Sequence, residues 1–157
     1  MIVELTALRA LPAGKRLLGV DLGTKTIGLA LSDVTRTVAS PFETLMRVKL
    51  TADAAKIAAI VAKHEVGGLV VGLPVNMDGT EGPMAQRARQ FARDMAERLD
   101  LPVALWDERL TTVAVERGMI AADFSRKKRA QLIDSAAAAY MLQGALGRLR
   151  AMAPPPA

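Results

Sequence analysis

The sequence contains no cysteine and one histidine, and only 3% of its residues are aromatic. The lack of cysteine excludes disulfides, thiolate nucleophiles and cysteine-based zinc sites, and one histidine cannot build a histidine-based metal site. Any chemistry therefore depends on carboxylates, hydroxyls, lysine or arginine. No apolar run approaches the ~20 residues of a membrane span, and Glu4 and Arg9 interrupt the N-terminal apolar stretch, which is atypical of a secretory signal. We expect a cytoplasmic protein.

The 157 residues are 51% hydrophobic and 24% charged, which is the composition of one globular domain. The formal net charge of +5 is a modest argument for a polyanionic partner. From charge alone, a basic surface that only favours solubility is an equally good interpretation.

Apolar runs and turn residues predict five strands, and helical periodicity predicts the helices between them. The expected strands are 15–22 and 26–32 as a hairpin, 37–48 at an edge because Pro41 cannot donate to a ladder, 66–73, and 102–106. The expected helices are 52–65 with Thr51 as N-cap, a helix capped by Thr80 that runs to about Leu99, 112–121, and a long final helix that begins near Arg126. We expect Trp106 and Tyr140 to anchor the core.

This order of elements predicts an α/β fold, in which an antiparallel meander is extended by crossovers into one mixed sheet with helices on its faces. The predicted organisation is an N-terminal extension at 1–14, a single domain at 15–150 and a flexible tail at 151–157.

Carboxylates follow two of the predicted strands. Asp21 ends the first strand, and Asp107 and Glu108 follow the last. Since ligands bind beyond the carboxyl ends of strands in open α/β sheets, these acids are expected at one rim. Asp134 interrupts an alanine-rich helix, where an acid on the packed side is costly unless it is paired or bound to a cation.

Each acid also has an ordinary structural interpretation. Asp21 can form a turn, Glu108 can pair with Arg109 or another base, and Asp134 can be exposed on its helix. Gathered together, three carboxylates repel one another and favour a divalent cation. Because only hard oxygen ligands are available, that cation is expected to be Mg²⁺ or Mn²⁺. Two such ions ~4 Å apart can catalyse phosphodiester hydrolysis without histidine or cysteine.

Four ordered motifs resemble the YqgF family, also called RuvX, a branch of the ribonuclease H-like nucleases: GVDLGTKTIGLALSD, VVGLPVNMDGTEGP, DERLTT and LIDSAAAAYML. The resemblance implies a ribonuclease H-like fold, with a mixed five-stranded sheet flanked by helices, and a metal-dependent phosphodiesterase. Its catalytic and metal-binding acids correspond to Asp21, Glu108 and Asp134. Members of the family are described as pre-16S rRNA nucleases, which mature small-subunit ribosomal RNA, and as candidate Holliday junction resolvases.

The sequence departs from the broader superfamily pattern after the fourth strand. Many ribonuclease H-like proteins carry an acid there, whereas this chain has Gly72, Leu73 and Pro74 and places Glu108 after the fifth strand. Asp107 is an alternative metal ligand.

Basic and polar residues near the predicted rim can contact phosphates. We expect nucleic-acid contacts from Lys25, Asn76, Arg87, Arg109, Arg126, Lys127, Lys128 and Arg129. The alternatives are a solvated helix start for the basic run and an Asx turn for Asn76.

Two rival functions remain at the level of sequence. Asp21-Leu22-Gly23-Thr24 also resembles the first phosphate loop of actin-like and sugar-kinase ATPases, although those enzymes use two such domains and this chain has room for one. The other rival is an inactive domain that only binds nucleic acid. Between the nuclease roles we favour ribosomal RNA, because no self-complementary apolar stripe indicates the dimer that junction resolution ordinarily needs.

Overall fold

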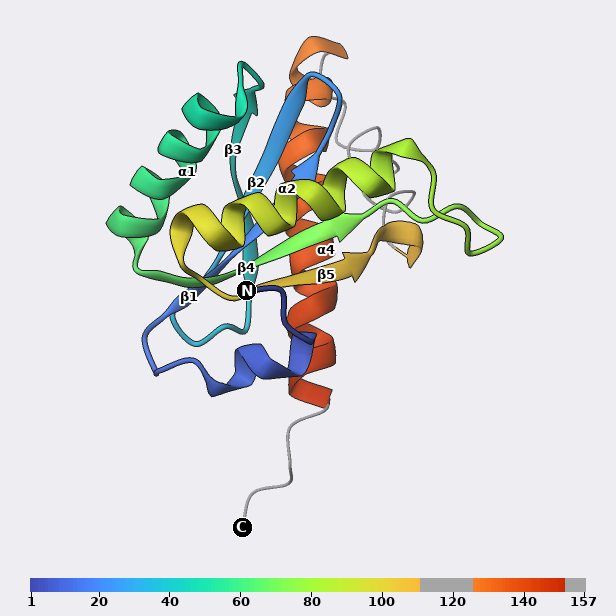
Figure 1. Cartoon of the computed structure of the whole chain (residues 1–157). Coiled ribbons are helices and arrows are strands. Elements are labelled where there is room, and N and C mark those ends of the chain that lie inside the picture. Colours follow the sequence, from blue (N-terminus) through green and yellow to red (C-terminus); the bar gives the residue numbers. More distant parts are fainter. Residues whose placement is uncertain (111–125, 152–157) are drawn as a thin grey trace.

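The computed structural model describes residues 1–110 and 126–151, with side chains described up to Arg109 and from Ser135 onward. Five strands, three α-helices and two short 3₁₀ helices make up this part of the chain (Figure 1). In chain order they are η1 (Leu5–Ala10), β1 (Arg16–Leu22), β2 (Thr26–Ser32), β3 (Ala39–Met46), α1 (Leu50–His64), β4 (Val66–Leu73), α2 (Pro83–Leu99), β5 (Val103–Asp107), η2 (Glu108–Leu110) and α4 (Arg126–Ala151). The predicted helix at 112–121 lies outside the described residues.

The five strands form one mixed sheet in the order β3-β2-β1-β4-β5. β1 pairs antiparallel with β2 and parallel with β4, β2 pairs antiparallel with β3, and β4 pairs parallel with β5. The mixed sheet and the edge position of β3 are thus confirmed. The register of β3 shifts opposite Leu29 and Ala30, near Pro41, as expected where a proline interrupts an edge ladder.

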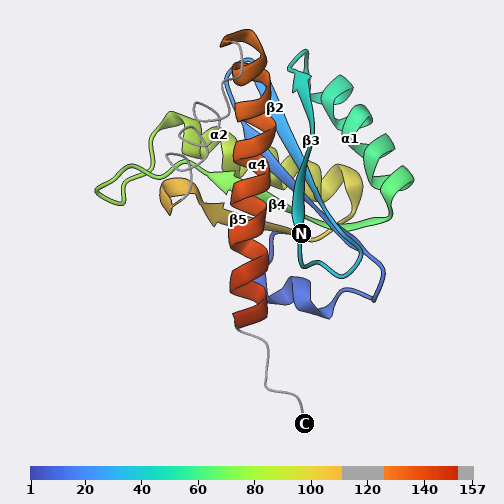
Figure 2. The same ribbon diagram turned by 180° about the vertical axis from the view of Figure 1, so that it is seen from behind.

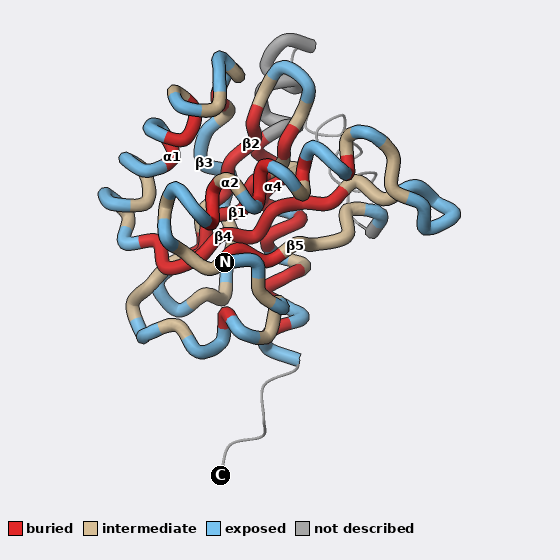
Figure 3. The backbone as a smooth tube through the Cα atoms, viewed as in Figure 1, coloured by how far each residue is buried: buried red, intermediate tan, exposed pale blue. Residues whose placement is uncertain are grey.

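Helices cover both faces of the sheet. α1 and α2 pack on one face, and α4 runs along the other (Figures 1 and 2). The faces alternate along β1, since Leu18, Val20 and Leu22 belong to the core beneath α1 and α2, whereas Leu17 belongs to the core beneath α4. Figure 3 shows the resulting burial, with β4 buried along its whole length as expected of a strand between two helical layers.

α4 lies very close to β1. A β-carbon added to Gly19 would lie 2.9 Å from Cβ of Leu142 and 3.2 Å from the carbonyl oxygen of Ala138. Only glycine allows this approach. The small residues of α4, including the buried Ala138 and Ala145, allow its backbone to settle on the sheet.

The first ten residues also join the domain. The Val3 amide donates to the Val103 carbonyl at 2.9 Å, and the Val103 amide donates to the Met1 carbonyl at 3.0 Å. Leu8 of η1 is fully buried against the α4 side of the sheet. The predicted extension is therefore packed on the sheet.

Three local predictions were wrong. α1 begins at Leu50 with Lys49 as N-cap, so Thr51 lies inside the helix. α2 begins at Pro83 with Gly82 as N-cap, because the fixed φ of proline suits the first helical position, and Thr80 belongs to the preceding loop. Tyr140 is 45% exposed on α4 and does not anchor the core, whereas Trp106 packs against Gly144 of that helix.

No helix among the described residues is long and apolar enough to cross a membrane.

Candidate active site

The fold brings Asp21 and Glu108 together at one rim of the sheet. Asp21 is the sixth residue of β1 and alternates with Val20 and Leu22, so it lies on the face that α4 covers. Glu108 is the first residue of η2, immediately after β5. Both side chains are half-buried. Two of the three predicted acids, one near the end of β1 and one directly after β5, therefore meet at the same rim of the sheet.

Gly72 of β4 makes this meeting possible. β4 lies between β1 and β5, with Val71 paired to Val20 and Gly72 paired to Trp106. A β-carbon on Gly72 would lie 2.8 Å from the carboxyl carbon of Glu108 and would clash with its Oε1 oxygen. The glutamate thus crosses β4 through the space that a side chain there would fill.

The pair holds a proton near neutral pH. Burial, a hydrogen bond with Asp21 and the negative charges of Asp21 and Asp107 together raise the pKa of Glu108 to about 9, and burial contributes most. A carboxyl group with this pKa is protonated at pH 7 unless a cation replaces the proton. The arrangement is that of two carboxyl groups that cannot both carry a charge without a counterion.

The carboxylate of Asp107 pairs with Arg109. Its carboxylate accepts hydrogen bonds from Nε and Nη2 of Arg109, the shortest at 2.6 Å, and from the Arg109 amide at 3.0 Å. These contacts lower the pKa of Asp107, chiefly through the Arg109 side chain. Asp107 and Arg109 form one unit beside Glu108, with the guanidinium held in a fixed orientation at the rim.

Asp134 lies in α4, and its side chain is outside the described residues. The backbone places it eight residues before Leu142, the residue that packs on Gly19 of β1. No group of three acidic or histidine side chains suited to a metal ion occurs among those that the structure describes, a set that does not include Asp134.

Arg47 is a residue that sequence reasoning missed. Its Nη1 donates to the Gly23 carbonyl at 2.7 Å, and its amide donates to the Lys25 carbonyl at 2.9 Å. The Gly23 amide in turn donates to Thr26 at 2.8 Å. Arg47 therefore fixes the turn that follows Asp21. No local sequence pattern could have revealed this, because the contact depends on the pairing of β2 with β3.

The other predicted nucleic-acid residues differ in their surroundings. Lys25 is exposed at the tip of the β1–β2 turn, and Arg87 is exposed on α2, with Nη1 at 3.5 Å from Sδ of Met84. The side-chain nitrogen Nδ2 of Asn76 donates to the Thr80 hydroxyl at 3.0 Å, so this side chain stabilises its own loop. The side chains of Arg126, Lys127, Lys128 and Arg129 lie outside the described residues.

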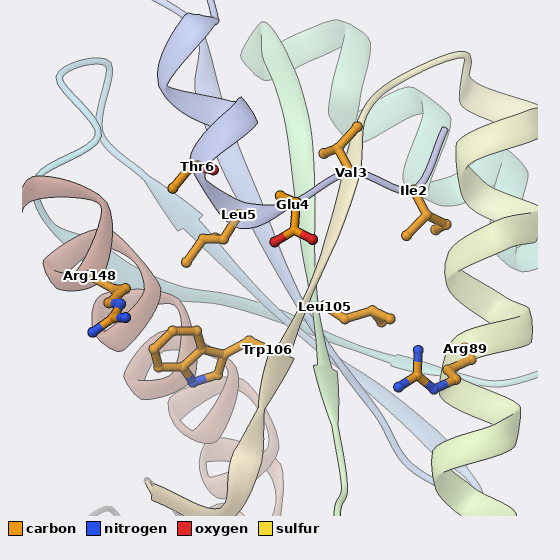
Figure 4. Close-up of a pocket in the computed structure, with 9 residues that line it drawn as sticks. All are labelled: Ile2, Val3, Glu4, Leu5, Thr6, Arg89, Leu105, Trp106 and Arg148. Atoms are coloured by element: carbon orange, nitrogen blue, oxygen red, sulfur yellow. The ribbon is translucent and has the colours of Figure 1, made fainter. Parts of the chain in front are cut away.

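A separate pocket of about 480 Å³ opens at the edge of β5 (Figure 4). Residues 2–6, Leu105 and Trp106 line it, and Arg89 of α2 and Arg148 of α4 approach it from opposite faces of the sheet. Neither Asp21 nor Glu108 lines this pocket. The carboxyl pair, which lies outside it, remains the chemical centre of the described structure.

The sheet order β3-β2-β1-β4-β5, with α4 packed across one face, defines a ribonuclease H-like fold. The model of the RuvX family, described as "Holliday junction resolvase", matches residues 15–148. The chain belongs to the RuvX family.

Curated relatives agree with this membership. A protein of Roseobacter denitrificans is 56% identical over 154 residues, which cover 96% of this chain and 94% of the relative. A protein of Paramagnetospirillum magneticum is 58% identical over 139 residues, which cover 88% of this chain and 90% of the relative. Both carry the name "Putative pre-16S rRNA nuclease".

Solved structures confirm the fold. RuvC of Thermus thermophilus in complex with a Holliday junction substrate aligns with a TM-score of 0.53 at 14% identity, covering 86% of this chain and 96% of RuvC. The fowlpox virus resolvase with its Holliday junction DNA aligns with a TM-score of 0.54 at 12% identity, covering 85% of this chain and 98% of the resolvase.

Proposed function

We propose that the protein is a metal-dependent endonuclease that hydrolyses phosphodiester bonds in precursor 16S ribosomal RNA. The observation that carries this proposal is the carboxyl pair of Asp21 and Glu108, which holds a proton where a cation would otherwise be needed. The names of the curated relatives support the ribosomal RNA substrate.

The donor set fits a hard divalent cation. Asp21 and Glu108 offer carboxylate oxygens from two rigid positions, and Asp134 on α4 is proposed as the third ligand. Oxygen ligands of this kind suit Mg²⁺ or Mn²⁺. Divalent ions bound there would activate a water and stabilise the leaving oxygen of a phosphodiester.

The chain's own residues prepare this site. Asp21 and Glu108 would release their shared proton on holding a cation, so protonation and cation binding would compete. We assign Asp107 to orienting Arg109, since that guanidinium already engages its carboxylate. Arg109 and the exposed Lys25 would then contact substrate phosphates on either side of the acids.

The basic residues at the start of α4 extend the proposed substrate path. Arg126, Lys127, Lys128 and Arg129 occupy the first turn of the helix that also carries Asp134. A phosphate backbone drawn to them would pass near the acids. Arg87, exposed on α2, is proposed as a further phosphate contact.

Holliday junction resolution is the second candidate, because the matching family model carries that description. Resolution needs two coordinated cuts and hence two metal sites presented to one junction. Maturation of an RNA end needs one site for each cut, which one chain supplies.

The test is cleavage of a precursor 16S RNA fragment and a four-way DNA junction side by side, with Mn²⁺ and with a chelator. We expect metal-dependent cleavage of the RNA, abolished in Asp21→Asn, which should keep the circular dichroism spectrum of the wild type. Cells depleted of the protein should accumulate unprocessed 16S ends that only the wild type corrects. Paired symmetric nicks in the junction, with normal RNA ends in depleted cells, would reverse the ranking. Binding without cleavage of either substrate would indicate an inactive nucleic-acid-binding domain.

A further inference from the structure

The segment between β4 and α2 forms a small hairpin. Val75 and Glu81 form an antiparallel bridge, and the Asn76 amide donates to the Thr80 carbonyl at 2.8 Å. The Gly79 amide donates back to the Asn76 carbonyl at 2.8 Å, and the φ of 89° at Gly79 suits glycine. The backbone of the tip is thus closed by its own hydrogen bonds.

Side chains reinforce both ends of this hairpin. At the tip, Asp78 Oδ1 accepts from the Thr80 hydroxyl at 2.6 Å and from the Thr80 amide at 3.0 Å. At the base, Arg89 of α2 makes two contacts of 2.5 and 2.7 Å with the Glu81 carboxylate. The polar side chains Asn76, Asp78, Thr80 and Glu81 are therefore engaged either within the hairpin or with α2.

The hairpin also presents a strongly exposed apolar side chain. Met77 lies at the tip and is 88% exposed, the highest value among the large hydrophobic side chains in the described part of the chain. A hairpin whose polar side chains are already engaged and that projects an apolar side chain is suited to contact an apolar surface.

The position of the hairpin indicates what that surface is. It begins two residues after Gly72, the residue over which Glu108 reaches Asp21, and it projects from the same side of the sheet as η2 (Figure 1). A nucleic acid whose backbone lies on the carboxyl pair would therefore pass near the hairpin. Nucleobases are the apolar faces of such a substrate, and they are accessible where they are unpaired or unstacked.

We propose that Met77 packs against the face of an unpaired nucleobase next to the cleavage site and thereby gives the enzyme a preference for interrupted over continuous duplexes. The inference rests on the proposed nuclease function and deepens it. A flexible, polarisable thioether adapts to any base, so the preference is for substrate shape and not for sequence. Asn76, predicted from sequence to contact substrate, instead maintains the hairpin that presents Met77.

The experiment compares two RNA duplexes of the same sequence in which a fluorescent purine analogue is either paired or left unpaired beside the cleavage site. Binding is measured without divalent metal, and cleavage is measured with Mn²⁺. The wild type should bind the unpaired form more tightly and change its fluorescence. Met77→Ala should lose about 10-fold in affinity for the unpaired form. Its affinity for the continuous duplex and its salt dependence should not change, because no phosphate contact is removed.

Two matched variants separate this contact from a general effect. Met77→Leu keeps an apolar side chain and should retain most of the preference. Val38→Ala removes part of a side chain that is 54% exposed in the turn between β2 and β3, and it should change nothing. Equal affinity of the wild type for both RNAs, or an unchanged preference in Met77→Ala, would overturn the inference while leaving the nuclease function intact. Failure of the wild type to bind or cleave either RNA would overturn both.

Discussion

The carboxyl group of Glu108 fills the space beside Gly72 that a side chain on β4 would occupy. The missing side chain at the end of β4 and the acid after β5 are therefore two parts of one arrangement. A glutamate is long enough to reach from η2 across β4 to Asp21, and it can do so only while position 72 lacks a β-carbon.

Gly72→Ala should displace the Glu108 carboxylate. The added carbon would lie 2.8 Å from the Glu108 carboxyl carbon, and β4 is held between β1 and β5, so the glutamate must move. We expect Mn²⁺ affinity and cleavage to fall by at least about 10-fold, with an overpacking cost of roughly 1–3 kcal/mol. Metal titration by calorimetry and cleavage kinetics measure the effect.

Gly147→Ala is the matched control, since nothing lies within 4 Å of a β-carbon at that position of α4. It should leave metal binding unchanged and stabilise the protein by about 0.5–1 kcal/mol. Equal Mn²⁺ affinity in Gly72→Ala and Gly147→Ala would show that Glu108 does not need the space.

Glu108→Gln should change how stability depends on pH in the metal-free protein. The pKa of Glu108 is raised in the folded state from 4.5 to about 9, so its favourable contribution is complete below about pH 4.5 and is lost as the pH rises towards 9. Glutamine cannot ionise and avoids this loss. Relative to the wild type, the variant should become progressively more stable between about pH 5 and pH 9, by less than the full electrostatic value of the shift because solvent screens this half-buried site.

Urea unfolding of both proteins in chelator across this pH range measures the difference. A constant difference in the free energy of unfolding would contradict the shared proton. Added Mn²⁺ should stabilise only the wild type at high pH, because the cation replaces the proton that the pair has lost.

Lys127→Ala with Lys128→Ala should weaken nucleic-acid binding for all sequences alike. If both side chains contact duplex phosphates, the slope of log K against log [salt] should become shallower by up to about two units. Lys56→Ala with Lys63→Ala is the control, since both lysines are exposed on α1, which covers the opposite face of the sheet. Identical slopes for the two double variants would mean that the basic start of α4 is only solvated.

Arg47→Met should loosen the turn that follows Asp21. It removes the 2.7 Å hydrogen bond to the Gly23 carbonyl but keeps the backbone bond to Lys25. We expect faster hydrogen exchange at the Gly23 amide, a lower kcat and a small change in KM, at a cost of roughly 1–3 kcal/mol.

Arg36→Met provides the comparison for Arg47. Arg36 donates to the carbonyls of Leu11, Pro12 and Lys15 at 2.8–3.1 Å, in the turn between β2 and β3. Its loss should reduce stability without lowering kcat at a temperature where the variant is folded. If kcat falls equally in both variants, Arg47 has no special role beside Asp21.

The position of the acids could be predicted from the sequence because each follows a short apolar run that indicates a strand. Asp21 and Glu108 follow apolar runs, and parallel strands bring their carboxyl ends to one rim, so the pairing of these residues was predictable. The contact of Glu108 with Gly72 was not, since it depends on how far a side chain crosses a neighbouring strand. A glycine in an apolar strand has several explanations, and only the three-dimensional structure distinguishes them.

The roles of residues that make long-range contacts could not be predicted from the sequence. Arg47 bonds to a turn more than twenty residues earlier, and nothing near it in sequence indicates this. From the sequence, Asn76 could form an Asx turn or contact substrate. In the structure its side chain donates to the Thr80 hydroxyl, a contact that depends on the hairpin fold of residues 75–81. Thr80 resembled an N-cap, yet Pro83 sets the start of α2 and leaves the threonine to stabilise the hairpin.

The sheet order also determines when activity can arise during synthesis. β1, β2 and β3 are consecutive and can pair as they leave the ribosome, but the parallel neighbour β4 comes after α1, and β5 comes after α2. Asp21 is therefore among the first residues to be placed, whereas Glu108 reaches it only after β5 has joined the sheet, and Asp134 follows later still. A nascent chain therefore lacks the proposed active site until nearly the whole domain has been made.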